Sequence, residues 1–350
     1  MNLSADTTPK LVFRLGHMGD VALTTGVLSH WHETRGDTFI FLTRKGNGPL
    51  LENHPAIKEV VEFSNDQLRT GPWFTVAGEL SRYFKGQPLI DLHGTLRSHI
   101  LSIRWNGPVI RYPKFGLIRR LYDRTRSERF RVQLEATTVP QRYSMAFDKT
   151  PPPAHSLTPR IYLTDRERDA AMVRLHATGL HAPLVGLHPY ATHPAKQWPK
   201  AHWLRLIELL NQAGMGWFII GRNKESLMAE NERDMTNQTN LRETCALLSR
   251  ANLLVTGDSG PMHLACGVNT PVAAIFGPTA RAWGFYPAGL KDRVIEQPLE
   301  CRPCSLHGAK PCPSGFDCMT GITPDSVMQN VIAMLGDTHA DKGEPTQRGK

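Results

Sequence analysis

Short apolar runs alternate with amphipathic stretches along the first half of the chain. The runs at 11–15, 38–43 and 88–94 are rich in aliphatic, β-branched and aromatic residues, a composition typical of buried strands. The stretch at 21–35, between the first two runs, has the mixed apolar and polar pattern of a helix. This alternation predicts parallel βαβ units, in which a helix connects two parallel strands.

The same alternation starts again in the second half. Apolar runs at 183–189, 216–221, 252–258 and 271–277 predict four more strands. The segment 201–214 predicts a helix, and its apolar face is formed by Trp203, Leu206, Ile207 and Leu210.

A proline-rich segment separates the two halves. Residues 149–160 include three consecutive prolines, which fit neither a helix interior nor a central strand. We therefore predict an α/β protein with two Rossmann-like, doubly wound domains. The predicted boundaries are a first domain at 1–150, a linker at 151–160, a second domain at 161–335 and a disordered tail at 336–350.

Composition is consistent with this organisation. Of the 350 residues 40% are apolar and 21% charged, which is typical of a globular protein and excludes a disordered chain. The N-terminus lacks the basic start and apolar core of a secretory signal. No run reaches the ~18 apolar residues that a membrane span requires. We expect a cytoplasmic protein.

The net charge of +9 is concentrated in one segment. Residues 111–131 carry eight arginines and lysines against only Asp123 and Glu128. Such a segment attracts the phosphates of a nucleic acid, an anionic lipid surface or an acidic substrate, or it is a solvated helix face. Interleaved apolar residues favour an amphipathic surface segment of the kind used at membranes, and no zinc-finger or RNA-binding motif supports nucleic acid.

Four of the six cysteines lie close together in the sequence, at Cys301, Cys304, Cys312 and Cys318. A reducing cytosol disfavours structural disulfides. The second CxxC pair of a typical zinc site is missing, because five residues separate Cys312 from Cys318. A zinc site, a redox-sensitive pair and plain reduced thiols all remain open, and we assign no metal.

The first loop with candidate chemistry is GHMGD, 16–20, which follows the first predicted strand. Its glycines let a ligand approach the backbone closely. Asp20 either stabilises the dipole of the following helix or accepts a proton from a substrate hydroxyl. The dinucleotide motif GxGxxG is absent here, which disfavours NAD at this site.

Two loops of the second half offer groups for phosphate. The loop at 188–199 carries the Thr192 hydroxyl and the Lys196 ammonium, a point charge suited to phosphate, although a solvated surface loop is the alternative. The loop at 255–267 runs from a strand into a helix start, where backbone amides can receive a diphosphate. Its side chains Asp258 and Ser259 are also candidate helix caps, and His263 is also a candidate structural histidine.

With these loops, the chain resembles the ADP-heptose:lipopolysaccharide heptosyltransferase family of bacterial glycosyltransferases. The matching stretches run in family order from residue 11 to about 327, and GDSGPMH followed by AIFGPT is the most specific part. The resemblance implies a GT-B fold, with two Rossmann-like domains that face a central cleft. It implies that the first domain receives the acceptor and the second the sugar nucleotide. The implied reaction is an inverting transfer of heptose from ADP-heptose to a hydroxyl of the acidic lipopolysaccharide inner core, without metal or cofactor.

The resemblance also assigns roles to residues. It implies that Asp20 is the general base and that Lys196 stabilises the charge on departing ADP. Ala191 stands where a family threonine is expected. The implied donor-binding residues are Thr192, Lys196, Glu225 (on the ribose), Asp258, Ser259, Gly260 and His263. The acceptor-binding residues expected from the resemblance and the basic charge are Gly19, Arg97, Arg119 and Arg120.

Three alternatives to this function remain at the level of sequence. One is a glycosyltransferase with another nucleotide-sugar donor or a different acceptor. A second is an NAD-dependent epimerase or dehydrogenase, which the absent GxGxxG opposes. A third is a basic, non-enzymatic protein that binds membrane or nucleic acid. The favoured interpretation predicts a peripheral protein on the anionic inner face of the bacterial inner membrane, with an ADP-sugar and acidic lipopolysaccharide as partners and no nucleic acid.

Overall fold

The structure is a computed structural model, and it describes residues 8–304, 312 and 315–340. The chain forms two compact units. The first unit comprises Met1–Thr164, Cys266–Val268 and Arg281–Gly289, and the second comprises Asp165–Ala265, Asn269–Ala280 and Leu290–Lys350.

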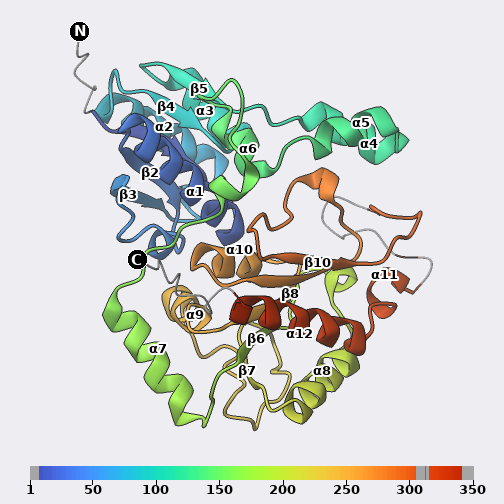
Figure 1. Ribbon diagram of the computed structural model, residues 1–350. Helices are drawn as coiled ribbons and strands as arrows, with labels where there is room; N and C mark the ends of the chain where they lie inside the picture. The colour runs from blue at the N-terminus through green and yellow to red at the C-terminus, as the bar shows by residue number, and fades with distance from the viewer. Residues whose placement is uncertain (1–7, 305–311, 313–314, 341–350) are drawn as a thin grey trace, which may run out of the picture. The chain divides into compact units, whose positions relative to one another are not determined.

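The first unit is built on a five-stranded sheet in the order β3-β2-β1-β4-β5, and every pairing is parallel (Figure 1). Its strands are β1 (Lys10–Phe13), β2 (Phe39–Arg44), β3 (Ile57–Phe63), β4 (Leu89–Asp91) and β5 (Val109–Arg111). Its helices are α1 (Met18–Arg35), α2 (Thr70–Tyr83), α3 (Leu96–Arg104), α4 (Gly116–Thr125), α5 (Glu128–Glu135) and α6 (Val139–Ser144).

Both faces of this sheet are covered by helices. Alternate residues of β1 point to opposite faces, so Leu11 and Phe13 belong to one apolar cluster and Val12 to another. The Leu11 cluster is completed by α2 and α3, through residues such as Trp73, and the Val12 cluster by α1 and α6. A sheet buried on both faces explains why its strands are nearly continuous apolar runs.

The second unit repeats this construction with the strand order β10-β9-β8-β6-β7, again all parallel. Its strands are β6 (Leu184–His188), β7 (Gly216–Ile219), β8 (Leu253–Gly257), β9 (Val272–Phe276) and β10 (Arg293–Glu296). Its helices are α7 (Asp165–Ala177), α8 (Lys200–Gln212), α9 (Leu241–Leu248), α10 (Gly260–Gly267), α11 (Asp317–Thr320) and α12 (Pro324–Ala340).

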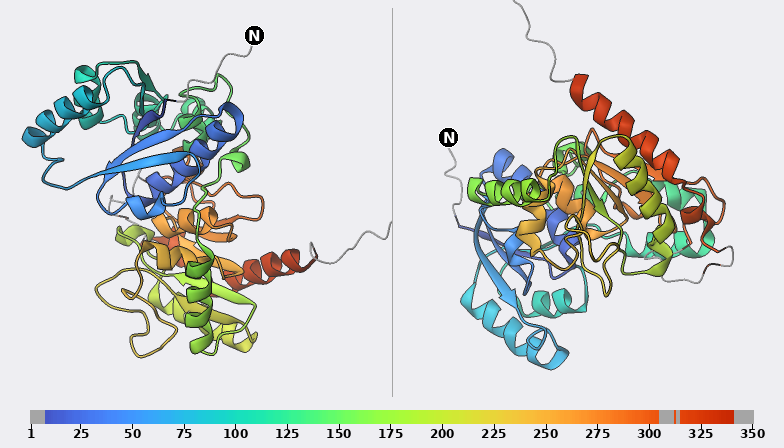
Figure 2. Two further views of the ribbon diagram at one scale, coloured as in Figure 1. Left: turned by 90° about the vertical axis from the view of Figure 1, so that its left-hand side faces the viewer. Right: turned by 90° about the horizontal axis from the view of Figure 1, so that it is seen from below.

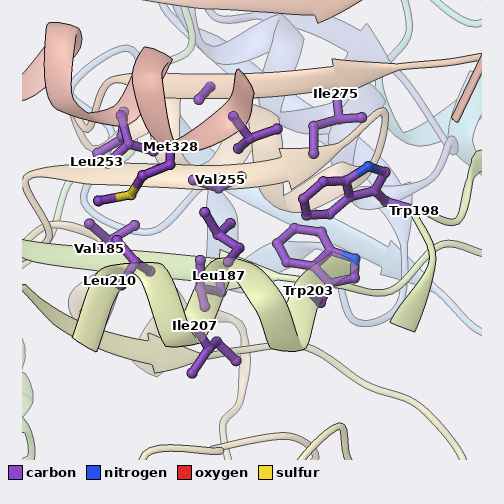
Figure 3. Packing of buried hydrophobic residues seen from close by; sticks show 14 of the residues in the cluster. Val185, Leu187, Trp198, Trp203, Ile207, Leu210, Leu253, Val255, Ile275 and Met328 are labelled. Atoms are coloured by element: carbon purple, nitrogen blue, oxygen red, sulfur yellow. The ribbon is translucent and has the colours of Figure 1, made fainter. Parts of the chain in front are cut away.

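Helices α8 and α12 pack side by side on one face of the second sheet (Figure 2). The predicted apolar face of α8 is confirmed, because all four of its residues are buried. Figure 3 shows Ile207 and Leu210 of α8 and Met328 of α12 among the side chains of β6 and β8. The prediction of two doubly wound parallel sheets is therefore confirmed.

The structure differs from the prediction in two segments, the proline-rich linker and the C-terminal tail. The proline-rich segment contains a short 3-10 turn (Ala154–Leu157), and its Leu157 is fully buried in the apolar cluster of α1. A Cβ added at Gly26 of α1 would lie 2.1 Å from the Thr158 carbonyl oxygen, so only glycine permits this close approach. Helix α12 continues to Ala340, and the rest of the predicted tail, 341–350, lies outside the described residues.

The basic segment 111–131 is not one helix. It contains the end of β5, the whole of α4 and the first turn of α5, and α4 ends at Arg126 in the left-handed conformation (φ 54°). Within the part of the chain that the structure describes, no helix is both long and apolar enough to cross a bilayer.

Candidate functional site

An ion pair fixes Asp20 at the carboxyl end of β1. Asp20 is the third residue of α1, and its Oδ1 lies 2.8 Å from Nη2 of Arg14, which directly follows β1. Arg14 is 7% exposed and also donates from Nη1 to the Leu92 carbonyl oxygen at 2.6 Å. A Cβ at Gly16 would lie 2.7 Å from Asp20 Oδ2. The carboxylate is therefore held in a defined position and remains partly exposed, at 22%.

Further polar groups gather around this ion pair. At the end of β4, Asp91 Oδ1 accepts the amides of His93 and Gly94, both at 2.9 Å. The Lys114 ammonium donates to the carbonyl oxygens of the same two residues, at 3.2 and 2.8 Å. Burial, followed by the nearby cations Arg14 and Lys114, lowers the pKa of His93 to about 3, so its imidazole is neutral at pH 7.

The predicted acceptor residues lie in different surroundings. Gly19 is buried within α1, and Arg119 is half-buried near Arg14 and Asp20. Arg120, the next residue of α4, is exposed. Arg97 of α3 donates to the Leu68 carbonyl oxygen at 2.7 Å and lines a pocket of about 630 Å³ at the start of α2. Of the three predicted acceptor arginines, Arg119 is therefore the one that is half-buried near Asp20.

In the second unit, three side chains from separate loops meet at one oxygen atom. The Lys196 ammonium lies 2.6 Å from Asp258 Oδ2, and the Thr279 hydroxyl donates to the same oxygen at 2.8 Å. Lys196 follows β6, Asp258 follows β8 and Thr279 follows β9, and these strands are neighbours in the sheet. The Lys196 cluster, as we call these three residues, thus lies at the carboxyl edge, where open α/β sheets bind ligands.

A second polar network orients Ser259, which precedes α10. Its hydroxyl lies 3.1 Å from His188 Nδ1 and 3.0 Å from Thr256 Oγ1, and these two atoms are themselves 3.1 Å apart. Burial lowers the pKa of His188 to about 4, so the imidazole is neutral and serves as a fixed hydrogen-bonding group. The amides at the start of α10 lie beside this network, and they are the groups expected to receive an anion.

The remaining predicted donor residues lie outside these two polar networks. Thr192 is exposed on the loop that carries Lys196, and His263 is buried in the first turn of α10. Glu225 is exposed and lines a pocket of about 200 Å³ between the loops that follow β6 and β7. Tyr190 lines the same pocket, and its hydroxyl accepts the Leu227 amide at 3.0 Å, which holds the Glu225 loop in place.

Arg302, which lies between Cys301 and Cys304 in the sequence, contacts the loop that carries Thr279 of the Lys196 cluster. This guanidinium is 8% exposed and donates to the carbonyl oxygens of Gly277 and of Thr279, the latter at 3.0 Å. The Cys304 amide donates to the carbonyl oxygen of Pro278 at 2.9 Å. The hydrogen bonds from Arg302 thus stabilise the loop from which Thr279 donates to Asp258.

Of the four clustered cysteines, Cys318 is the one buried in the apolar core of the second unit. Burial, followed by the neighbouring thiol of Cys304, raises the pKa of Cys318 to about 11, so this thiol is protonated at pH 7. Among the described residues, which leave out 305–311 and 313–314, no three metal-ligating side chains are arranged to hold an ion.

Sequence reasoning did not assign roles to Arg14, His188, Thr279 or Arg302. Thr279 stands in the stretch AIFGPT, and His188 ends a predicted strand at the edge where ligands bind. Position after a parallel strand was therefore the available signal for both. Arg14 directly follows β1, so the same signal was available for it. Arg302 acts through Gly277 and Thr279, which are more than 20 residues away in the sequence, and the chain offered no comparable signal for it.

Two doubly wound parallel sheets with polar side chains at their carboxyl edges are the architecture of the GT-B fold. The ADP-heptose lipopolysaccharide heptosyltransferase II of Escherichia coli has this fold, with a TM-score of 0.70 and 21% identity over 95% of this chain and 100% of that chain. A family 9 glycosyltransferase from Veillonella parvula aligns with a TM-score of 0.74 and 19% identity, over 96% of this chain and 99% of that one.

The chain belongs to glycosyltransferase family 9 (heptosyltransferase), which matches residues 86–310, more than half of its length. It is 29% identical to lipooligosaccharide heptosyltransferase 2 of Haemophilus ducreyi over 44% of this chain and 48% of that protein. In such matches the chain spans about half the length of the curated relatives or less. Lipopolysaccharide heptosyltransferase 1 of Pseudomonas aeruginosa is 26% identical over 93% of this chain and 97% of that protein.

Proposed function

We propose that the chain transfers a heptose from ADP-heptose to a hydroxyl of the acidic lipopolysaccharide inner core, with inversion at the anomeric carbon. The Lys196 cluster carries the proposal, because it fixes a cation beside a helix start at the ligand-binding edge of the second sheet. Membership of family 9 supports a transferase. The names of the relatives and the E. coli heptosyltransferase structures with ADP and with ADP-2-deoxy-2-fluoro heptose support the donor and acceptor.

On the donor side, the diphosphate would lie against the amides at the start of α10, with Lys196 beside it. Asp258 holds the Lys196 ammonium in place, and the remaining ammonium hydrogens can bind phosphate oxygens. The pocket lined by Tyr190 and Glu225 is suited to the nucleoside, with the Glu225 carboxylate accepting hydrogen bonds from the ribose hydroxyls.

On the acceptor side, Asp20 would take the proton of the attacking hydroxyl. The acceptor oxygen then bonds to the anomeric carbon of heptose on the face opposite to ADP, and the bond between that carbon and the ADP oxygen breaks. ADP leaves with the electron pair of this bond, and Lys196 stabilises the negative charge that develops on it. Arg14 keeps the Asp20 carboxylate in one orientation for this proton transfer.

Calorimetry with nucleotides tests the donor assignment. We expect ADP to bind at least ten-fold more tightly than NAD or UDP, because the E. coli heptosyltransferase of the same fold was solved with ADP and with ADP-2-deoxy-2-fluoro heptose. Tighter binding of NAD would favour a dehydrogenase or epimerase, and tighter binding of UDP would favour another donor. A chain that binds none of the three would be consistent with a non-enzymatic basic protein and would contradict the proposal.

We further propose that α4 and α5 make the peripheral contact with the anionic inner face of the inner membrane. Arg120 and Arg124 are exposed on α4, and exposed apolar side chains lie among the charges, with Leu117 69% and Val132 57% exposed. Basic and apolar side chains together favour binding at the lipid interface.

Sedimentation with vesicles of phosphatidylcholine and phosphatidylglycerol tests this contact. The double variant Arg120→Glu, Arg124→Glu should bind about thirty-fold more weakly or worse, since each of the two lost basic residues contributes about 1 kcal/mol near an anionic surface. The variant Arg82→Glu, Lys85→Glu, which changes two exposed residues at and after the end of α2, is the matched control. Equal weakening in both variants, or in neither, would refute the assignment to α4 and α5.

A further inference from the structure

The loop that follows β2 contacts the turn between β1 and α1, which carries Asp20. Asn47 lies in this loop and is 7% exposed. Its side-chain amide donates from Nδ2 to the Gly16 carbonyl oxygen at 3.1 Å. Because β1 and β2 are neighbouring parallel strands, the segments that leave them lie next to each other at the carboxyl edge of the first sheet. Asn47 thus binds the backbone of the turn that leads to Asp20.

A second contact joins the same two segments. The fully buried hydroxyl of Thr43, in β2, donates to the Arg14 carbonyl oxygen at 2.9 Å. The Arg14 amide in turn donates to the Leu42 carbonyl oxygen at 3.0 Å. Asn47 Nδ2 also donates to Thr43 Oγ1, at 3.2 Å, which links the two contacts. The backbones of Arg14 and Gly16 are therefore both held by β2 and the loop after it.

The loop that carries Asn47 is itself held in place by β3. The amides of Gly46 and Gly48, on either side of Asn47, both donate to Glu62 Oε1, at 2.9 and 2.7 Å. The Asn47 backbone amide donates to the Arg44 carbonyl oxygen at 3.2 Å. Side chains on a backbone fixed in this way hold their hydrogen-bond partners in a defined position.

Gly16 lies directly against the Asp20 carboxylate. A Cβ added at Gly16 would lie 2.7 Å from Asp20 Oδ2 and 3.0 Å from Arg14 Nε. The Gly16 backbone is therefore next to both members of the Arg14–Asp20 ion pair. A displacement of this backbone would move the carboxylate or change the geometry of its ion pair.

We propose that Asn47 is a positioning residue for the general base: by holding the Gly16 carbonyl oxygen, it keeps the Asp20 carboxylate where it can take the proton of the acceptor hydroxyl. This role rests on the proposed function, in which Asp20 is the base. A base must lie within hydrogen-bond reach of the proton that it takes, and a misplacement of about 1 Å can lower a rate about 100-fold. Asn47 acts through Gly16 and need not touch either substrate.

The turnover of Asn47→Leu tests this role. Leucine is branched at the same carbon as asparagine but donates no hydrogen bond, so the Gly16 carbonyl oxygen loses the Asn47 amide. We expect kcat to fall about ten-fold or more, while the KM of the acceptor and the dissociation constant of ADP change by less than about three-fold. Steady-state ADP release gives kcat and KM, and calorimetry gives the affinity for ADP. A wild-type kcat in Asn47→Leu would overturn the proposal.

A double-mutant cycle with Asp20→Asn separates positioning of the base from a general loss of structure. If Asn47 acts through the Asp20 carboxylate, Asn47→Leu should lower the residual kcat of Asp20→Asn by no more than about two-fold. An equal fractional loss in both backgrounds would show that Asn47 acts independently and would overturn the proposal. Wild-type turnover in Asp20→Asn would refute the base and this role together. Turnover that depends on Asp20 but is unchanged in Asn47→Leu would reject the role of Asn47 alone.

Two further variants protect the test from a folding defect. Asn47→Ala removes the same donor without adding volume, and it should show the same loss of kcat that depends on Asp20. Asn252→Leu is the matched control, because Asn252 is half-buried and its Oδ1 accepts the Leu184 amide at 2.9 Å, at the amino ends of β8 and β6. This control should lower Tm and keep kcat within about two-fold. An equal loss of kcat in Asn252→Leu, or no loss in Asn47→Ala, would overturn the proposal.

Discussion

Asp20→Asn should lower kcat about 1,000-fold and leave the dissociation constant of ADP unchanged. A positioned general base contributes roughly 10²- to 10⁴-fold to such a reaction, and asparagine removes the basic oxygen. Because asparagine keeps the shape of the side chain and can still accept a hydrogen bond from Arg14, the local structure should survive. Steady-state release of ADP from ADP-heptose gives kcat, and calorimetry gives the affinity for ADP.

The control for this variant is Asp37→Asn. Asp37 is 8% exposed and pairs with Lys10 and Arg35, so it is also an ion-paired carboxylate, but it lies outside the surroundings of Asp20. We expect it to lower the free energy of unfolding and to keep kcat within about two-fold. If Asp20→Asn retained more than a tenth of the wild-type kcat, Asp20 would be a residue of the helix start and not the base.

Lys196→Met should lower kcat about 100-fold or more and weaken ADP binding about ten-fold. Removal of one group that stabilises developing charge costs roughly 10²- to 10³-fold in kcat. The loss of ADP affinity has a second cause. Without Lys196, the negative charge of Asp258 would repel the diphosphate, and Thr279 would be its remaining partner in the cluster. The double variant Lys196→Met, Asp258→Asn should therefore regain part of the ADP affinity but not the turnover.

Lys10→Met is the matched control for the loss of an ion-paired lysine. Lys10 is 18% exposed and pairs with Asp37, against 15% for Lys196 with Asp258. Turnover and ADP affinity should both stay near the wild-type values in this control. Wild-type kcat in Lys196→Met would show that the Lys196 cluster is a structural ion pair only.

Strand positions could be predicted wherever the sheet is buried on both faces. Apolar runs revealed β1, β2, β4 and the central strands of the second sheet because parallel strands under helices contain few polar residues. The edge strand β7 was also predicted, because three of its four residues are buried. The other edge strands escaped this criterion: β3 (IKEVVEF) exposes charged residues, and β5 and β10 are short and only partly buried. A search for apolar runs therefore misses an edge strand that is short or exposes charged residues.

The sequence could predict those site residues that lie directly after a parallel strand. Lys196 and Asp258 follow two strands that are neighbours in the sheet, so parallel pairing brings them together. His188 and Thr256 occupy paired register positions on the same two strands, but register is not readable from the sequence. Thr279 joins the cluster because β9 lies next to β8, which also depends on strand order.

The two arginines Arg119 and Arg120 illustrate another limit. Both belong to one basic stretch, and their residue types and neighbours suggest equal roles. Successive residues of a helix point about 100° apart, so the burial of each depends on how the helix is rotated. Phe115, in the left-handed conformation at the N-cap, precedes the first turn of α4, and charge counting did not predict this orientation.

The most direct test of the proposed transfer uses the purified protein with ADP-heptose and a heptose-deficient lipopolysaccharide acceptor. ADP release and the mass of the acceptor are measured in the same reaction, with the wild type and with Asp20→Asn. We predict ADP release that requires the acceptor, an acceptor heavier by one heptosyl residue, and loss of both signals in Asp20→Asn. An unmodified acceptor in the wild-type reaction, or equal transfer by Asp20→Asn, would contradict the assignment of this chemistry to these residues.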